Sequence, residues 1–186
     1  LNLVYLCRHF GLPEVADYWE SVVALNTWQQ HRIARLVVQK LFGTVTGKRL
    51  AIFGFAFKAD TNDTREAPAI RICRDLLEEG AQLVIHDPKV SADQIARDLN
   101  QEPASQVDRL SGSGSWARAN SVEDAALGAD AVLVLTEWQQ YRDLNWQALA
   151  ARMRKPAWVF DARAVADPAQ IKAAGLSLWR VGDGEG

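Results

Sequence analysis

The chain has 186 residues, of which 48% are hydrophobic and 24% are charged, a composition typical of globular proteins and sufficient to bury a core. This composition excludes a disordered tail and a disulfide-dependent miniprotein. The formal net charge is −2, so no overall electrostatic attraction favours nucleic acid or an anionic membrane. No stretch approaches the roughly 18 to 20 apolar residues needed to cross a bilayer, and no secretory signal pattern is present. We therefore expect a cytoplasmic protein without nucleic-acid or membrane partners.

The two cysteines, Cys7 and Cys73, lie far apart, and neither belongs to a paired motif. A disulfide framework or a zinc site therefore has no support, and we expect buried, reduced thiols and no bound metal. The chain starts at Leu1, and its single methionine is Met153. We expect it to be the rear part of a longer polypeptide.

Residues 1–42 show helical spacing of apolar side chains. A first helix should end at Gly11, and a second should start at Pro13 and continue to Gly43, with polar residues at 26 and at 29–30 interrupting its apolar stripe. A helix of about 30 residues would be ~45 Å long, whereas a domain of this size has a radius of gyration near ~14 Å. Residues 1–46 should therefore form a helical linker and dimerisation segment that overhangs the next domain.

From Lys48 onward, short apolar runs alternate with helical stretches, a pattern that predicts a parallel sheet covered on both faces. The expected strands are 49–53, 82–86, 131–136, 157–160 and 176–181. Helix starts are expected near Pro68, Ser91, Ser121, Asn145 and Asp167. Residues 101–120 are expected to form a surface loop or hairpin with a mobile Ser/Gly tip. The prediction is an α/β fold: residues 47–186 form a Rossmann-like parallel sheet of about five strands with helices on both faces, preceded by the long helical segment.

In such a sheet, ligands bind beyond the carboxyl ends of the strands. The longest connection there is residues 54–66, thirteen residues between the first strand and its helix. Connections of this kind usually have two to six residues, and unusually long ones are often functional. Residues 54–66 are therefore the first candidate for a binding loop.

Three cations could meet at this edge, since Lys58 and Arg65 flank the loop and Arg163 follows the fourth expected strand. Together with a helix N-terminus they would suit phosphate, and Phe57 could stack on a planar base. The alternative is that Lys58 and Arg65 pair with acidic residues of the same solvated loop. Composition alone leaves both interpretations open.

A dinucleotide site is a competing interpretation, because Gly54 follows a strand and Asp87 ends the next one, where a ribose-binding acid would stand. No second or third glycine follows Gly54, so close approach to a pyrophosphate is not supported. The nucleophile candidates are also poor. Cys73 falls on an apolar helical face, and His86 closes a strand, where packing or hydrogen bonding is the expected role.

The string from Gly54 to Glu66, GFAFKADTNDTRE, closely resembles the signature loop of the UDP-binding domain of UDP-glucose 6-dehydrogenases. Further stretches similar to this family are residues 1–7, 12–16, 87–90, 136–138 and 160–163. The resemblance covers essentially the whole chain. The residues of these motifs are more similar to those of the glucose dehydrogenases than to those of their GDP-mannose and N-acetylmannosamine relatives.

The resemblance implies NAD-dependent oxidation of UDP-glucose to UDP-glucuronate by two hydride transfers through a cysteine thioester. In the family, the nucleophilic cysteine lies a few residues before the stretch that residues 1–7 resemble. We therefore expect it upstream of Leu1, together with an amino-terminal domain that binds most of the NAD. No catalytic residue is expected in this chain, and the chain alone should be inactive.

Position by position, Phe57, Lys58 and Arg163 match family residues that contact the UDP-sugar, and Arg65 resembles an arginine that reaches NAD across the cleft. The long helix is similar to the family's central spine, which implies a homodimer and leaves room for a higher oligomer. Three alternatives stay open. The chain could be a stand-alone nucleotide-sugar-binding and dimerisation module, it could belong to a dehydrogenase for UDP-N-acetylmannosamine or GDP-mannose, or its sheet could bind NAD itself.

Overall fold

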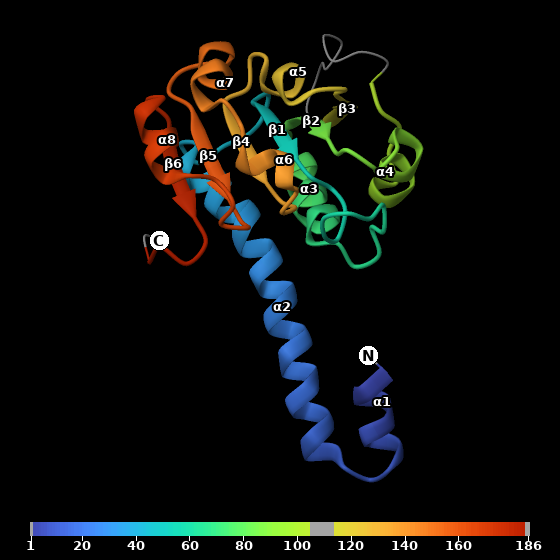
Figure 1. Ribbon diagram of the computed structural model, residues 1–186. Coiled ribbons are helices and arrows are strands. Elements are labelled where there is room, and N and C mark those ends of the chain that lie inside the picture. The colour runs from blue at the N-terminus through green and yellow to red at the C-terminus, as the bar shows by residue number, and fades with distance from the viewer. Residues whose placement is uncertain (1, 105–113, 185–186) are drawn as a thin grey trace.

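The computed structural model of the chain describes residues 2–104 and 114–184 and contains one parallel sheet (Figure 1). Its six strands lie in the order β3-β2-β1-β4-β5-β6, and all neighbouring pairs are parallel. They are β1 (Arg49–Phe53), β2 (Gln82–His86), β3 (Ser115–Arg118), β4 (Ala131–Val134), β5 (Trp158–Asp161) and β6 (Ser177–Arg180). The predicted α/β fold with a Rossmann-like parallel sheet is confirmed.

Helices lie on both faces of this sheet and form the segment that projects from it. They are α1 (Asn2–His9), α2 (Pro13–Lys40), α3 (Pro68–Glu78), α4 (Ala92–Leu99), α5 (Val122–Ala126), α6 (Gln139–Arg142), α7 (Trp146–Arg152) and α8 (Pro168–Ala173). Contacts join α2, α3 and α4 into one layer, and they join α5, α7 and α8 into another. The strand order changes direction at β1, whose neighbours are β2 and β4. In open sheets, a binding crevice forms beside such a reversal, at the carboxyl ends of the strands.

One strand was missed by the sequence prediction. Residues 101–120 were expected to be a loop or hairpin, but Ser115–Arg118 forms β3 and pairs in parallel with β2. The strand is short and lies at the sheet edge, and only Trp116 and Ala117 within it are buried, so its apolar pattern is weak. The sheet therefore has six strands rather than five. The expected Ser/Gly tip comprises residues 111–115, of which 111–113 lie outside the described residues.

Helix α2 has 28 residues, which corresponds to ~42 Å. Its last turns belong to the main core through Ile33, Val37 and the following Leu41, whereas its first half projects from the globular part. Helix α1 folds back along this projecting half after a turn at Gly11, where φ is +73° (Figure 1). The overhang expected from helix length is thus present. No helix in the described ranges is long and apolar enough to span a bilayer.

The predicted helix starts are set by short polar side chains. Backbone N–H groups in the first turns donate to Ser91, Ser121, Asn145 and Asp167 at 3.2, 3.1, 3.1 and 2.8 Å. Each bond satisfies a donor that has no partner inside its helix. These caps place α4, α5, α7 and α8 where the sequence indicated.

The end of β1 approaches β4 so closely that only glycine fits at position 54. Gly54 has φ +91°, and a Cβ added there would lie 2.4 Å from Thr136 Cβ and 2.8 Å from the Thr136 backbone nitrogen. Its N–H donates to the His86 carbonyl at 2.9 Å, while the Thr136 hydroxyl donates to the Ala56 carbonyl at 2.7 Å. The chain is therefore held on both sides where it leaves the sheet.

We predict that Gly54→Ala lowers the free energy of unfolding by about 3 kcal/mol, because it combines a left-handed φ with a collision in a packed region. Gly43→Ala is the matched control, since Gly43 has φ +80° but no atom within 4 Å of an added Cβ. It should cost only about 1 kcal/mol. Urea denaturation of the two variants measures the difference, and equal losses would show that the Thr136 contact is unimportant.

Candidate functional site

A cleft of about 960 Å³ lies at the carboxyl edge of the sheet, between the strand ends and the middle of α2. The strand-end wall consists of Phe57, Leu135, Ala162, Arg163 and Val181. The other walls come from the start of α3 with Glu66, Pro68, Arg71 and Ile72, from α2 with Val23, Asn26, Thr27, Gln29, Gln30 and Ile33, and from α1 with Asn2 and Leu3. This volume is at the upper end of the range for small-molecule and cofactor sites.

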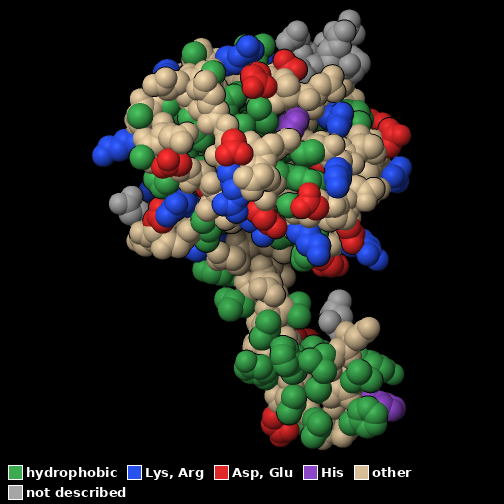
Figure 2. Space-filling model, viewed as in Figure 1, with side chains coloured by type: hydrophobic (Ala, Val, Ile, Leu, Met, Phe, Trp, Pro, Cys, Tyr) green, Lys and Arg blue, Asp and Glu red, His purple; other side chains and the backbone are tan. Residues whose placement is uncertain are grey.

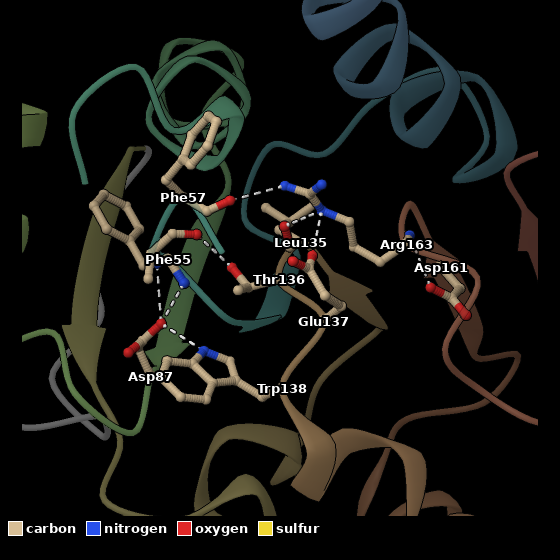
Figure 3. A network of polar contacts seen from close by, with 10 residues as sticks. Phe55, Phe57, Asp87, Leu135, Thr136, Glu137, Trp138, Asp161 and Arg163 are labelled. Carbon is tan, nitrogen blue, oxygen red and sulfur yellow. Dashed lines mark hydrogen bonds and ion pairs between the residues drawn. The ribbon is translucent and has the colours of Figure 1, made fainter. Parts of the chain in front are cut away.

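The buried carboxylate of Asp87 holds the loop that forms one wall (Figure 3). Its Oδ2 atom accepts hydrogen bonds from the N–H groups of Phe55 and Ala56 at 2.7 and 3.0 Å, and from the indole N–H of Trp138 at 3.2 Å. Its Oδ1 atom accepts from the backbone N–H groups of residues 89 and 90, both at 2.9 Å. One carboxylate thereby joins the segments that follow β1, β2 and β4.

This geometry does not favour a dinucleotide site on the sheet itself. A ribose-binding acid must offer a free oxygen to the ligand, but Asp87 is fully buried and both of its oxygens bind donors of the protein. Thr136 also occupies the space beside Gly54 that a pyrophosphate would approach. The acid at the end of the second strand is therefore structural.

A second buried carboxylate, Asp161, orders the turn after β5. Its oxygens accept from the N–H groups of Arg163 at 3.0 Å and Ala166 at 2.8 Å. Ala164, between them, has φ +54°, and Glu66 on the α3 wall has φ +59°. Non-glycine residues in this region carry strain of about 1 to 3 kcal/mol, and such residues cluster at functional sites. Strained backbone thus flanks the cleft on two walls.

Of the three cations predicted at this edge, Arg163 is the one that lines the cleft. Its Nε atom donates to the Leu135 carbonyl at 2.8 Å and lies 3.4 Å from Oε2 of Glu137. One terminal nitrogen, Nη2, makes a longer contact of 3.4 Å with the Phe57 carbonyl (Figure 3). Among the described residues, Nη1 has no hydrogen-bond partner. The guanidinium group is therefore oriented while one of its nitrogens stays available to a ligand.

Phe57 and Lys58 lie at the same edge. The Phe57 side chain is 46% exposed and lines the cleft with Arg163. Lys58 is exposed and follows Phe57 directly, so it lies close to Arg163, but it does not line the cleft. Of the residues predicted from the sequence, the structure thus brings Phe57 and Arg163 into the cleft and leaves Lys58 next to Phe57, outside the lining.

Arg65 does not line the cleft and binds Asp63. Its Nε and Nη2 atoms donate to the two carboxylate oxygens at 3.0 and 2.8 Å, although the arginine side chain is 88% exposed. These hydrogen bonds lower the pKa of Asp63 from 3.8 to about 2 and raise the pKa of Arg65. The sequence left open whether Lys58 and Arg65 pair with acidic residues of their own loop. Arg65 does so through Asp63, whereas Lys58 forms no ion pair with a described residue.

His86 and Tyr141, which lie outside the cleft, bind each other. The imidazole Nδ1–H of His86 donates to the Tyr141 hydroxyl at 3.0 Å, and that hydroxyl donates to the His86 carbonyl at 3.0 Å. Burial lowers the pKa of His86 and raises the pKa values of Tyr141 and the Cys73 thiol. Cys7 is also buried, and both thiols are free. Within the described ranges, no cysteine or histidine lines the cleft.

Sequence reasoning missed the α2 wall and Arg71 as parts of the cleft. A signal for α2 was present, because Asn26, Gln29 and Gln30 interrupt the apolar stripe of the helix where these side chains meet the cleft. Arg71 gave no signal, since a polar residue on the exposed side of an amphipathic helix is ordinary. The hydrogen bonds of Asp87 join segments that lie far apart in the sequence, so its structural role could not be predicted from the residues around it.

Comparison with known proteins identifies the domain. Residues 51–168 match the UDP binding domain of the UDP-glucose/GDP-mannose dehydrogenase family. The chain is 42% identical over 193 aligned residues to UDP-glucose 6-dehydrogenase 5 of Oryza sativa subsp. japonica, and 43% identical over 183 residues to UDP-glucose 6-dehydrogenase of Caenorhabditis elegans. These alignments cover 98% of this chain but only 39% and 37% of the two relatives.

Solved structures share the fold at lower identity. A UDP-glucose dehydrogenase from Pyrobaculum islandicum aligns with a TM-score of 0.70 at 20% identity, covering 96% of this chain and 34% of that one. A UDP-D-ManNAc dehydrogenase from Pyrococcus horikoshii aligns with a TM-score of 0.61 at 20% identity, covering 95% of this chain and 34% of that one. The family match over most of the sheet and the resemblance of the sequence agree. The chain belongs to the UDP-glucose/GDP-mannose dehydrogenase family and contains its UDP-binding domain.

Proposed function

We propose that the chain is the carboxyl-terminal, UDP-sugar-binding part of an NAD-dependent UDP-glucose 6-dehydrogenase. The observation that carries this proposal is the cleft in which Phe57 and Arg163 lie together on the strand-end wall. An aromatic face next to a guanidinium group is suited to a base attached to phosphate. The 42% identity to named UDP-glucose 6-dehydrogenases supports glucose as the sugar.

Each wall of the cleft offers chemistry that a nucleotide sugar can use. The half-exposed ring of Phe57 can stack on uracil, and the free Nη1 of Arg163 can donate to a phosphoryl oxygen. The flexible ammonium group of Lys58 reaches the same charge from the rim. Amides and a hydroxyl from α2, at Asn26, Thr27 and Gln30, can exchange hydrogen bonds with the ribose or the sugar.

The redox chemistry is assigned to residues outside this chain. When bound, NAD would accept the hydrides of the oxidation, but the described residues do not form its site, since Asp87 is fully engaged and Thr136 fills the space at Gly54. The one residue of this chain proposed to contact NAD is Arg65, whose side chain is exposed. The thioester-forming cysteine is likewise proposed to precede Leu1. The first residues of α1, Asn2 and Leu3, line the cleft, so a preceding segment would start beside it.

We also propose that residues 1–46 form a homodimerisation segment and residues 47–186 the UDP-binding domain. Of the fourteen exposed large hydrophobic side chains in the described ranges, eleven lie on or between α1 and α2. Figure 2 shows them gathered on the projecting part of the molecule. Monomeric proteins rarely expose so much contiguous apolar surface, so a second copy of this segment is the expected cover. The cytoplasm stays the proposed location, because two free thiols suit a reducing compartment.

The proposed UDP site can be tested by ligand binding. The chain should bind UDP with measurable heat at millimolar ligand, and Arg163→Ala should weaken binding by about 1.5 kcal/mol or more, the usual loss for a charged hydrogen bond. Lys58→Ala should weaken it less, because Lys58 lies at the rim. Arg152→Ala is the charge-matched control, since Arg152 is exposed near the amino ends of the strands, where its carbonyl accepts from Gly128.

Isothermal titration calorimetry of these variants tests whether the cleft binds UDP through Arg163. Absence of heat with the unaltered chain at millimolar UDP, or an unchanged affinity in Arg163→Ala, would remove the site assignment. GDP titrated in parallel tests the base, and a preference for GDP over UDP would favour a GDP-sugar relative. A stand-alone binding module would give the same UDP affinity, and the coding sequence upstream of Leu1 distinguishes it from part of an enzyme.

The proposed dimerisation through the apolar surface of α1 and α2 can be tested by the mass of the chain in solution. The chain should have twice its own mass in solution, and Leu25→Asp should yield single chains, because Leu25 is 62% exposed on the projecting half of α2. Leu127→Asp is the control, since Leu127 is 47% exposed but follows α5 on the globular part. Light scattering at several concentrations measures the mass. Open-ended growth, or a dimer that persists in Leu25→Asp, would contradict this interface.

A further inference from the structure

Arg71 is a cation of the cleft without an anionic partner. It lies on the exposed side of α3, three residues after Pro68, and lines the cleft together with Phe57 and Arg163. Among the described residues, its guanidinium group makes no hydrogen bond or ion pair. Its five N–H donors are therefore directed to water in the ligand-free molecule.

The other arginines near the cleft differ in this respect. Arg65 is held by both oxygens of Asp63, and Arg163 is already engaged by the Leu135 carbonyl and by Glu137. Glu66 also lines the cleft but does not pair with Arg71. An unpaired guanidinium group beside a partly paired one leaves donors for a ligand with several negatively charged oxygens.

The position of Arg71 favours an anion for a second reason. It lies in the second turn of α3, whose first residue is Pro68 and whose N-cap residue, Ala67, makes no side-chain cap hydrogen bond. The N-terminus of an eleven-residue helix carries a partial positive charge that adds to that of the side chain. The α3 wall and the strand-end wall therefore each present positive charge to the same cleft.

We propose that Arg71 is an additional anion-binding residue of this site, which holds the phosphoryl oxygens of a nucleoside diphosphate from the α3 wall while Arg163 holds them from the strand-end wall. The proposal rests on the proposed function and extends it. A diphosphate group offers two phosphoryl units. The unpaired fork of Arg71 can bind two oxygens of one unit, and the free Nη1 of Arg163 can donate to an oxygen of the other.

The test compares the affinities of the 186-residue chain for UDP, uridine and inorganic pyrophosphate by calorimetry. Arg71→Ala should weaken UDP and pyrophosphate binding by roughly twofold to fivefold, the range for an exposed charged contact, and should leave uridine binding unchanged. Arg71→Lys keeps the charge but lacks the fork, so its affinity for UDP should fall between those of Arg71→Ala and the unaltered chain. Arg152→Ala, which removes the same charge from the far edge, should bind UDP as the unaltered chain does.

The outcomes separate this inference from the proposed function. If Arg163→Ala weakens UDP binding but Arg71→Ala does not, the site stands and the role of Arg71 is overturned. If Arg71→Ala and Arg152→Ala weaken binding equally, the effect is one of net charge, which also overturns it. If the unaltered chain binds neither UDP nor pyrophosphate, the proposed function fails and this inference fails with it.

Discussion

The structure depends on one buried carboxylate. Asp87 is fully buried, and its two oxygens accept five hydrogen bonds, four from backbone N–H groups and one from Trp138. A buried charge costs several kcal/mol unless hydrogen bonds replace its water, and bonds to a charged group contribute about 1.5 to 3 kcal/mol each. Because the donors come from the segments after β1, β2 and β4, any displacement of one segment leaves this charge poorly satisfied. The position of Phe57 at the cleft follows from this constraint, since the preceding residues 55 and 56 are fixed to Asp87.

Asp161 repeats the arrangement at the end of β5. There a buried carboxylate accepts from two backbone N–H groups and fixes the turn that carries Arg163. The two segments that carry the aromatic ring and the cation of the strand-end wall are thus each anchored in the sheet, and the long contact between Arg163 and the Phe57 carbonyl joins them. The strand-end wall of the cleft is therefore formed by anchored strand ends, while the α2 wall comes from a helix whose first half leaves the globular part. A ligand would contact both a fixed edge and the base of the projecting helix.

The sequence allowed much of this fold to be predicted, because its signals are local. Apolar runs marked β1, β2, β4, β5 and β6, and single capping residues such as Ser91 and Asn145 marked helix starts. Strand β3 was missed because edge pairing with β2 requires few apolar residues. The candidate loop and Arg163 could be selected from the sequence because polar residues at strand ends are informative in parallel sheets, and the structure places Phe57 and Arg163 in one cleft. The contacts of Asp87, the ion pair of Arg65 and the place of Arg71 in the cleft depend on the tertiary arrangement and could not be predicted from spacing.

The role of Asp87 is tested most directly by amide hydrogen exchange in the unaltered chain, measured by nuclear magnetic resonance. The N–H groups of Phe55, Ala56 and Val90 lie in loops, but each donates to the buried carboxylate of Asp87. We expect them to exchange nearly as slowly as the N–H group of Ile52 in the centre of β1, since their exposure requires disruption of the whole edge. Exchange as fast as at exposed Asn62 in the same loop would show that Asp87 does not hold these segments, and would contradict the account.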